Sequence, residues 1–198
     1  MIDLIQRHLE AIYDVDAPDV RDFLVHEDEV RSTCGELRAA REWVLVRQDD
    51  DGVGIGVWFH PDDLGAVAER TPSAAVAEAL PAWAALTEGV SHFLLLVRRM
   101  CRDETVSLLE LEAQAEVDKY VTARLHGRPE EARRVLHAPL APDLAAHERE
   151  RYAEAGRLAR RYATHLERIQ GVDALLAELR RFYRLSGHAR MERLRHAA

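Results

Sequence analysis

Two polar residues one helical turn apart, Glu88 and His92, have the spacing of a metal-ligand pair. Residues four apart share one face of a helix, so both side chains can reach one ion. A neighbouring antiparallel helix can add Glu110, Gln114 and Asp118, which recur at every fourth position. One imidazole among carboxylates suits a divalent metal, with Glu88 and His92 as its ligands. No H-E-x-x-H motif occurs, so structural hydrogen bonding by these residues is the alternative.

A second polar stripe in the same region consists of Glu112, Glu116 and Lys119. On a solvated helix, Glu116 and Lys119 would form an ordinary ion pair of about 0.3 kcal/mol. If another part of the chain covers them, burial is expected to lower the pKa of Lys119, as acid–base chemistry requires. Lys119 is the only lysine among 27 Lys and Arg residues. It marks either a position that needs a compact ammonium group or a chance survival.

The C-terminal segment is rich in arginine. Arginines interleaved with aromatic residues can hold a phosphate backbone and stack on bases, which gives a nucleic-acid hypothesis. However, Phe182 and Tyr183 continue an apolar stripe from Leu175 and Leu179, so we expect them in the core. The arginines that would carry nucleic-acid binding are Arg180, Arg181, Arg184, Arg190, Arg193 and Arg195.

Charge is divided unevenly along the chain, whose net charge is −8. Residues 1–123 carry 11 Lys and Arg against 25 Asp and Glu, whereas residues 124–198 carry 16 against 10. Either an acidic body and a basic tail neutralise each other within one fold, or the tail offers a basic surface to an acidic partner.

Several function classes have no support in the sequence. No phosphate-binding glycine loop and no G-x-S-x-G element occurs. The sequence therefore gives no support for a P-loop or Rossmann nucleotide site or for the nucleophile of an α/β-hydrolase. Cys34 and Cys101 lack the spacing of a disulfide framework or a cysteine zinc site. The N-terminus does not resemble a signal peptide, and no unbroken apolar run approaches the ~18 residues of a membrane span. We therefore expect a cytoplasmic protein without a membrane partner.

These residues depend on two long helices, predicted at 81–101 and 106–125 and joined by a polar turn at 102–104. The first has a core stripe that runs from Trp83 to Met100 and Cys101. The second is apolar on two sides, which predicts that it is sandwiched between other elements. Its ridge of Glu110, Gln114 and Asp118 would then be partly desolvated and would need polar partners. Glu112, Glu116 and Lys119 would occupy its remaining surface.

The remaining segments predict a mainly α fold, a helical bundle with one β-hairpin at about 42–59 packed on it. Asp51-Gly52 between β-branched and aromatic runs is a strong hairpin signal. The hairpin could pack on helices, pair with a strand hidden in residues 25–40, or add to a partner's sheet. Residues 1–72 would form an N-terminal subregion and 73–198 the bundle, within one compact unit, and helices at 143–170 and 172–184 would close it.

For function, we expect first a non-enzymatic module that binds a protein partner or self-associates. The long helix predicted at 143–170 has an apolar stripe along its length, and the hairpin has no third strand beside it. Both would expose apolar surface that a partner could bury. The alternative is a small metal-dependent hydrolase that uses Glu88, His92 and the carboxylates of the second long helix. A second alternative is a nucleic-acid-associated factor that uses the arginine-rich tail.

Overall fold

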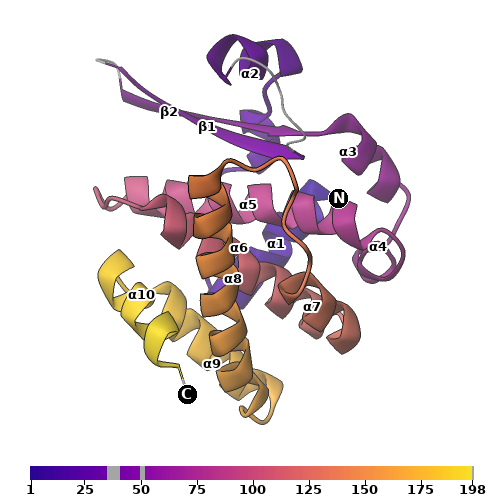
Figure 1. Cartoon of the computed structure of the whole chain (residues 1–198), viewed down its shortest axis with the longest axis vertical. Coiled ribbons are helices and arrows are strands. Elements are labelled where there is room, and N and C mark those ends of the chain that lie inside the picture. The colour runs from indigo at the N-terminus through magenta and orange to yellow at the C-terminus, as the bar shows by residue number, and fades with distance from the viewer. Residues whose placement is uncertain (35–40, 50–51, 198) are drawn as a thin grey trace.

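A computed structural model describes residues 1–34, 41–49 and 52–197. The fold is mainly helical, with one antiparallel β-hairpin packed on a long helix, as predicted (Figure 1). The elements in chain order are α1 (Ile2–Tyr13), the 3-10 helix η1 (Val20–Phe23), α2 (Glu27–Cys34), β1 (Glu42–Asp49), β2 (Gly52–Phe59), α3 (Pro61–Val67), α4 (Pro72–Glu78), α5 (Leu80–Met100), α6 (Leu108–Leu125), α7 (Pro129–Leu136), α8 (Ala146–Glu167), α9 (Val172–Tyr183) and α10 (Gly187–His196).

The central pair α5 and α6 lies close to the predicted boundaries. After α5 the chain turns at Asp103, whose φ of 53° is in the left-handed region that Asp tolerates better than most residues. Ser107 then caps α6, because its Oγ accepts a hydrogen bond from the Glu110 amide at 3.2 Å. The turn and cap bring the two helices together side by side.

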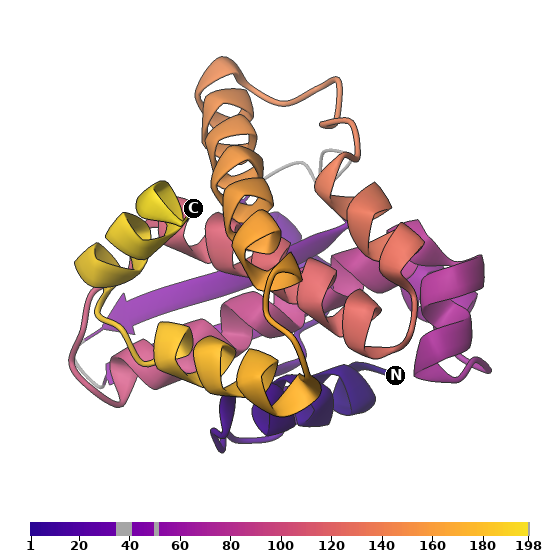
Figure 2. The same cartoon turned by 90° about the horizontal axis from the view of Figure 1, so that it is seen from below.

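Helix α6 is surrounded by other helices, as its two apolar sides predicted. It packs against α5, α7 and α8, and Figure 2 shows α8 crossing it. The ridge of Glu110, Gln114 and Asp118 is therefore buried, with 2% or less of each residue exposed. Glu112 and Lys119 are buried as well and Glu116 is partly buried. The prediction that this second stripe lies on open surface is wrong, because Lys119 pairs with Glu88 of α5 and Glu112 pairs with Arg151 of α8.

The hairpin packs on α5 through residues of both strands. Val57 and Phe59 of β2 are buried in the main hydrophobic core. Val25 continues the pairing on the outer side of β2, since its amide donates to the carbonyl oxygen of Val57 at 3.0 Å. The tight turn predicted at Asp51-Gly52 and most of the segment considered for a third strand lie outside the described residues.

Helix α5 is long and apolar enough, by length and composition, to cross a membrane. The sequence had led us to expect no such segment. Within the fold, 72% of the qualifying stretch is buried, as in a core helix. Its last turn leaves the core, because Met100 is 37% exposed and Cys101 is exposed. The predicted core stripe therefore ends before these two residues.

Candidate metal centre

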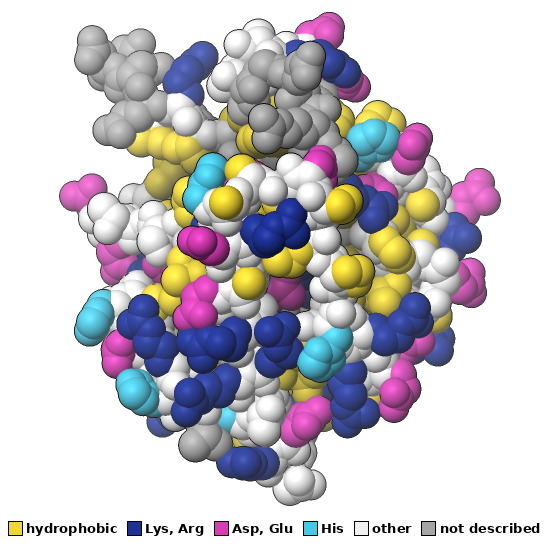
Figure 3. All heavy atoms as spheres, in the orientation of Figure 1, with side chains coloured by type: hydrophobic (Ala, Val, Ile, Leu, Met, Phe, Trp, Pro, Cys, Tyr) yellow, Lys and Arg dark blue, Asp and Glu magenta, His cyan; other side chains and the backbone are white. Residues whose placement is uncertain are grey.

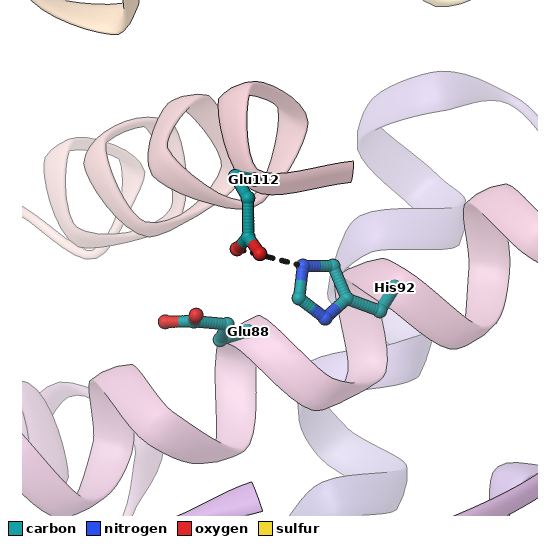
Figure 4. Close-up of side chains that lie close together, drawn as sticks. All are labelled: Glu88, His92 and Glu112. Carbon is teal, nitrogen blue, oxygen red and sulfur yellow. Dashed lines mark ion pairs between the residues drawn. The ribbon is translucent and has the colours of Figure 1, made fainter. Parts of the chain in front are cut away.

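Helices α5 and α6 present polar side chains to each other at one point along their contact. Glu88 and His92 lie one turn apart on α5, and Glu112 lies opposite on α6. Figure 4 shows the carboxylate of Glu112 pointing at the ring of His92, with which it forms an ion pair, whereas the carboxylate of Glu88 extends away from the ring. One donor atom from each of the three side chains lies within 4.8 Å of the others. His92 and Glu112 are buried, and Glu88 retains a side-chain exposure of 18%.

The two ring nitrogens of His92 face different carboxylates. Nε2 lies 3.6 Å from Oε2 of Glu112 on α6. Nδ1 lies 3.8 Å from Oε1 of Glu42, the first residue of β1. Both distances exceed a normal hydrogen bond of about 2.9 Å. The ring is thus held between an acid from a helix and an acid from the hairpin, with neither nitrogen in close hydrogen-bond contact.

Lys119 on α6 joins the two helices beside His92. Its Nζ donates to Glu88 Oε2 at 2.8 Å and to Glu116 Oε1 at 2.7 Å. Its side chain is 9% exposed, so this is a nearly buried triad and not the surface ion pair expected from an i, i+3 spacing. One oxygen of Glu88 is engaged by the ammonium group, and the other oxygen is available to a further partner.

Burial and neighbouring charges shift the ionisation of the whole group. Burial raises the pKa of Glu42 to about 8, opposed by the nearby charge of His92. Burial alone would lower the pKa of His92, but the carboxylates of Glu112 and Glu42 raise it to about 9. Burial alone would also lower the pKa of Lys119, yet Glu116 and Glu88 raise it above its usual value. The sequence-based expectation of a lowered lysine pKa is therefore wrong.

Glu116 and Glu88 differ although both bind Lys119. Burial raises the pKa of Glu116 by more than Lys119 lowers it. Burial also acts to raise the pKa of Glu88, but Lys119 and His92 together hold it below the usual value. Of the two carboxylates, Glu88 is therefore the one that stays ionised more easily and the better donor for a cation.

Several buried polar atoms around His92 have no hydrogen-bond partner among the described residues. They are Nε2 of His92, Oε2 of Glu112 and Oε2 of Glu42. The other oxygen of Glu112 is held by Arg151 on α8, whose Nε lies 3.3 Å from Oε1. Buried polar groups without partners are rare, and a bound ion is one recognised explanation. Arg151 thus holds one oxygen of Glu112, and the other oxygen faces Nε2 of His92 at ion-pair distance without a hydrogen bond.

A small closure of the group would bring three donor atoms to the spacing that a divalent metal needs, and any fourth ligand would come from outside the group. Zinc bonds of ~2.1 Å place tetrahedral donor atoms about 3.4 Å apart. The pair formed by His92 Nε2 and Glu112 Oε2 is already 3.6 Å apart, and the widest separation in the group is 4.8 Å. Side-chain rotations that move the donor atoms by about 1 Å would bring all three to this spacing.

The ridge residues of α6 do not join this group, contrary to the expectation that they would face Glu88 and His92. Asp118 is the centre of a separate network: Tyr13 and Gln114 donate to its Oδ1, and Ser91 donates to its Oδ2 at 2.6 Å. Burial raises the pKa of Asp118 to about 6, although these hydrogen bonds act to lower it. The bonds from Tyr13 and Ser91 join α1 and α5 to α6, whereas the bond from Gln114 lies within α6.

Glu110 lies further along α6 and binds two arginines. Arg99 of α5 donates to its Oε1 at 2.5 Å, and Arg190 of α10 lies 3.5 Å from the same oxygen. Arg190 is fully buried and donates to the Tyr183 carbonyl oxygen at 2.6 Å. This cluster fastens the C-terminal helix to the central pair.

The arginines proposed for nucleic acid are bound within the fold. Basic side chains do gather on the face that α8 to α10 share (Figure 3). Besides Arg190, each of the other five has a partner in its own chain: Arg180 binds the carbonyls of Ala11 and Ile12, Arg181 and Arg193 pair with Glu178, Arg184 with Asp14, and Arg195 with Glu192. Phe182 and Tyr183 are buried, as expected.

Sequence reasoning missed Glu42 and Arg151. The signal for Glu42 was present, because strand alternation places it on the same face as Val44, which packs against the core. An acid on the inward face of a strand needs a buried partner. Arg151 gave no such signal, since nothing in a helical pattern says which neighbour its side chain reaches.

No family model, curated protein or solved structure matches the chain.

Proposed function

We propose that this protein binds one divalent transition-metal ion between α5 and α6, through Glu88, His92 and Glu112. The observation that carries the proposal is the buried pair His92 Nε2 and Glu112 Oε2, which face each other at ion-pair distance, 3.6 Å, and make no hydrogen bond among the described residues. A third donor from Glu88 lies within 4.8 Å of both. One imidazole nitrogen and two carboxylates give the ion three protein ligands of types that zinc sites use.

The charge of the surrounding residues supports a cation. Because the pKa of His92 is raised to about 9, its ring carries a proton at neutral pH, which a metal must displace in order to bind. With His92 then neutral, the group contains four carboxyl groups, from Glu42, Glu88, Glu112 and Glu116. Only the two cations Lys119 and Arg151 bind these carboxylates in the described part of the chain. When His92 has lost its proton and all four carboxyl groups are ionised, two negative charges are left over in a largely buried position, which is costly without a counter-charge. One divalent ion would balance them.

The donor types favour a borderline ion over a hard one. Imidazole nitrogen suits zinc, iron or nickel, and carboxylate oxygen suits manganese. Calcium takes six to eight oxygen ligands and magnesium a nearly all-oxygen shell, which this set does not offer. Zn²⁺ and Mn²⁺ are therefore the ions to test first.

Burial favours a stably held ion over a hydrolytic centre. Hydrolysis needs a coordination position that a substrate can reach. The side chains of His92 and Glu112 are only 9% and 7% exposed, and Lys119 occupies the Glu88 side of the group at 9%. The ion would thus fix α5 against α6 and stabilise the fold.

The test is titration of metal-free protein with Zn²⁺ and Mn²⁺ by calorimetry, with elemental analysis of the purified protein. We expect one ion per chain for the wild type, and at least a hundredfold weaker binding for H92A and E112Q. His147→Ala is the matched control, because His147 is exposed on α8. Wild-type protein that binds neither ion, or H92A that binds as tightly as H147A, would disprove the site.

A second proposal is self-association through the hairpin. Cross-strand pairing places Val44, Val57, Val46 and Ile55 on one face. Val57 lies in the core, but Val46 is 53% exposed and Val53, at the start of β2, is 42% exposed. Figure 1 shows the hairpin extending beyond the helices on one side. Edge strands with exposed apolar residues favour strand-to-strand pairing with a second copy.

Light scattering over a concentration series tests this proposal. We expect a dimer in the wild type and a monomer for V46K or V53K. Val172→Lys is the control, because Val172 is 59% exposed on α9, away from the hairpin. A wild type that stays monomeric at high concentration would refute self-association and leave the metal site unaffected.

A further inference from the structure

We infer that Glu42 is a positioning residue for the proposed ion: its carboxylate accepts a hydrogen bond from Nδ1–H of His92 and thereby presents Nε2 to the metal. The inference rests on the proposed function and deepens it. It makes the β-hairpin, which supplies none of the three ligands, a working part of the metal centre.

The geometry around the imidazole ring carries the inference. Nε2 faces the ligand Glu112, whereas Nδ1 faces Glu42 on the other side of the ring. Histidines that bind metals through one nitrogen almost always donate the other N–H to a carboxylate or carbonyl group. Such a hydrogen bond fixes the tautomer and the ring orientation and makes the metal-binding nitrogen more basic. Glu42 Oε1 needs to approach by about 1 Å to make this bond.

The backbone next to Glu42 is anchored by two interactions of Arg41, and Gly89 leaves room for the Glu42 side chain. The backbone beside it is anchored because the amide of His60 donates to the Arg41 carbonyl oxygen at 2.9 Å. The Arg41 side chain binds both carboxylate oxygens of Asp63 at the start of α3. On α5, a Cβ at Gly89 would lie 3.2 Å from Glu42 Oε2, so the missing side chain leaves room for the carboxylate.

Glu42 faces His92 across 3.8 Å, and this is the ion pair that the described residues show for it. Its side chain is 14% exposed, yet its Oε2 makes no hydrogen bond among them. A buried acid without a full set of partners lowers stability. A role in orienting a metal-bound histidine accounts for an acid at this position, where the inward strand face would otherwise favour an apolar residue.

The experiment compares zinc binding and the His92 tautomer in wild type, E42A, E42Q and the exposed control Glu69→Ala. Calorimetry measures affinity, and long-range ¹H–¹⁵N NMR of the histidine ring reports which nitrogen carries the proton. Loss of an outer-shell partner typically weakens metal binding about 10–100-fold. We expect this weakening of zinc binding for E42A. The weakening should be smaller for E42Q, because the glutamine oxygen still accepts a hydrogen bond from Nδ1–H. E69A should match the wild type.

The outcomes separate the two proposals. Wild-type protein that binds zinc through Nε2, with E42A equal to it in affinity and tautomer, would overturn the positioning role and leave the metal site standing. Zinc bound through Nδ1 would also overturn it. Failure of the wild type to bind would remove both. Because E42Q keeps the side-chain volume, a folded E42Q variant gives a decision even if E42A does not fold.

Discussion

A Cβ on residue 89 would lie 2.5 Å from Cε1 of Phe59, so Gly89 is what allows β2 to rest directly on α5. The same missing side chain leaves room for Glu42. Glycine in a helix is otherwise unfavourable by roughly 0.5–1 kcal/mol relative to alanine. At this position the close approach of hairpin and helix outweighs that cost.

The first prediction concerns this contact. Gly89→Ala should lower the free energy of unfolding by about 1–3 kcal/mol, because the methyl group forces Phe59 to move. Gly65→Ala is the control, since a Cβ there meets nothing within 4 Å. In α3 it should be neutral or stabilising by up to about 1 kcal/mol. Urea denaturation of both variants measures the difference, and equal stabilities would contradict the packing described.

Lys119 gives the second prediction. Lys119→Met should cost about 3–5 kcal/mol, because Glu88 and Glu116 would lose their shared cation while remaining largely buried. Lys119→Arg keeps the charge but adds volume in a packed site, at a cost of about 1–3 kcal/mol. The control R7K, at a side chain 62% exposed, should stay within about 0.5 kcal/mol of wild type. Chemical denaturation is the measurement, and a neutral K119R would show that arginine fits.

The third prediction is a pH dependence from Asp118. Burial raises its pKa to about 6, against hydrogen bonds from Ser91, Tyr13 and Gln114 and the charge of Arg190. A raised carboxyl pKa means that the folded state binds the proton more tightly than the unfolded chain does. Its contribution to stability is therefore present below about pH 4 and is lost as the pH rises through 6.

Denaturation at pH 4, 5, 6 and 7 tests this sign. The wild type should lose on the order of 2–3 kcal/mol relative to Asp118→Asn between pH 4 and 7. Asp143→Asn, at an exposed position, should follow the wild-type profile. If the D118N and wild-type curves run parallel, the carboxyl group does not titrate in this range.

The fourth prediction links the ion to stability. A ligand that binds only the folded state at a hundred times its dissociation constant adds about 2.7 kcal/mol. For a chain of this length that corresponds to a rise in Tm of about 5–10 °C. The rise should vanish with chelator and in E112Q, and persist in the control Glu150→Gln, at an exposed position on α8. Scanning calorimetry with and without zinc decides the matter.

The sequence predicted the elements of the fold better than their mutual orientation. Apolar residues on two sides of α6 correctly implied that Glu110, Gln114 and Asp118 are buried. Periodicity cannot say which side of α6 faces which side of α5, because a rotation by one residue turns the helix by 100°. Glu112 therefore replaced the ridge residues as the neighbour of His92.

The hairpin shows the same limit from another direction. The alternation in β1 placed Glu42 and Val44 on one face, but the contact of that face with His92 depends on the small residue at position 89 in a distant helix. Such long-range pairings arise from packing between elements, which one chain's periodicity does not encode. The partners that the C-terminal arginines find within the chain escaped prediction for the same reason.

The only lysine of the chain is enclosed between two acids, and this has a practical consequence for chemical labelling. Acylating reagents that modify side-chain amines have one target, and in the native protein that amine is protonated and shielded. The rate at which Lys119 is acylated, followed by mass spectrometry, would therefore report how often the interface between α5 and α6 opens.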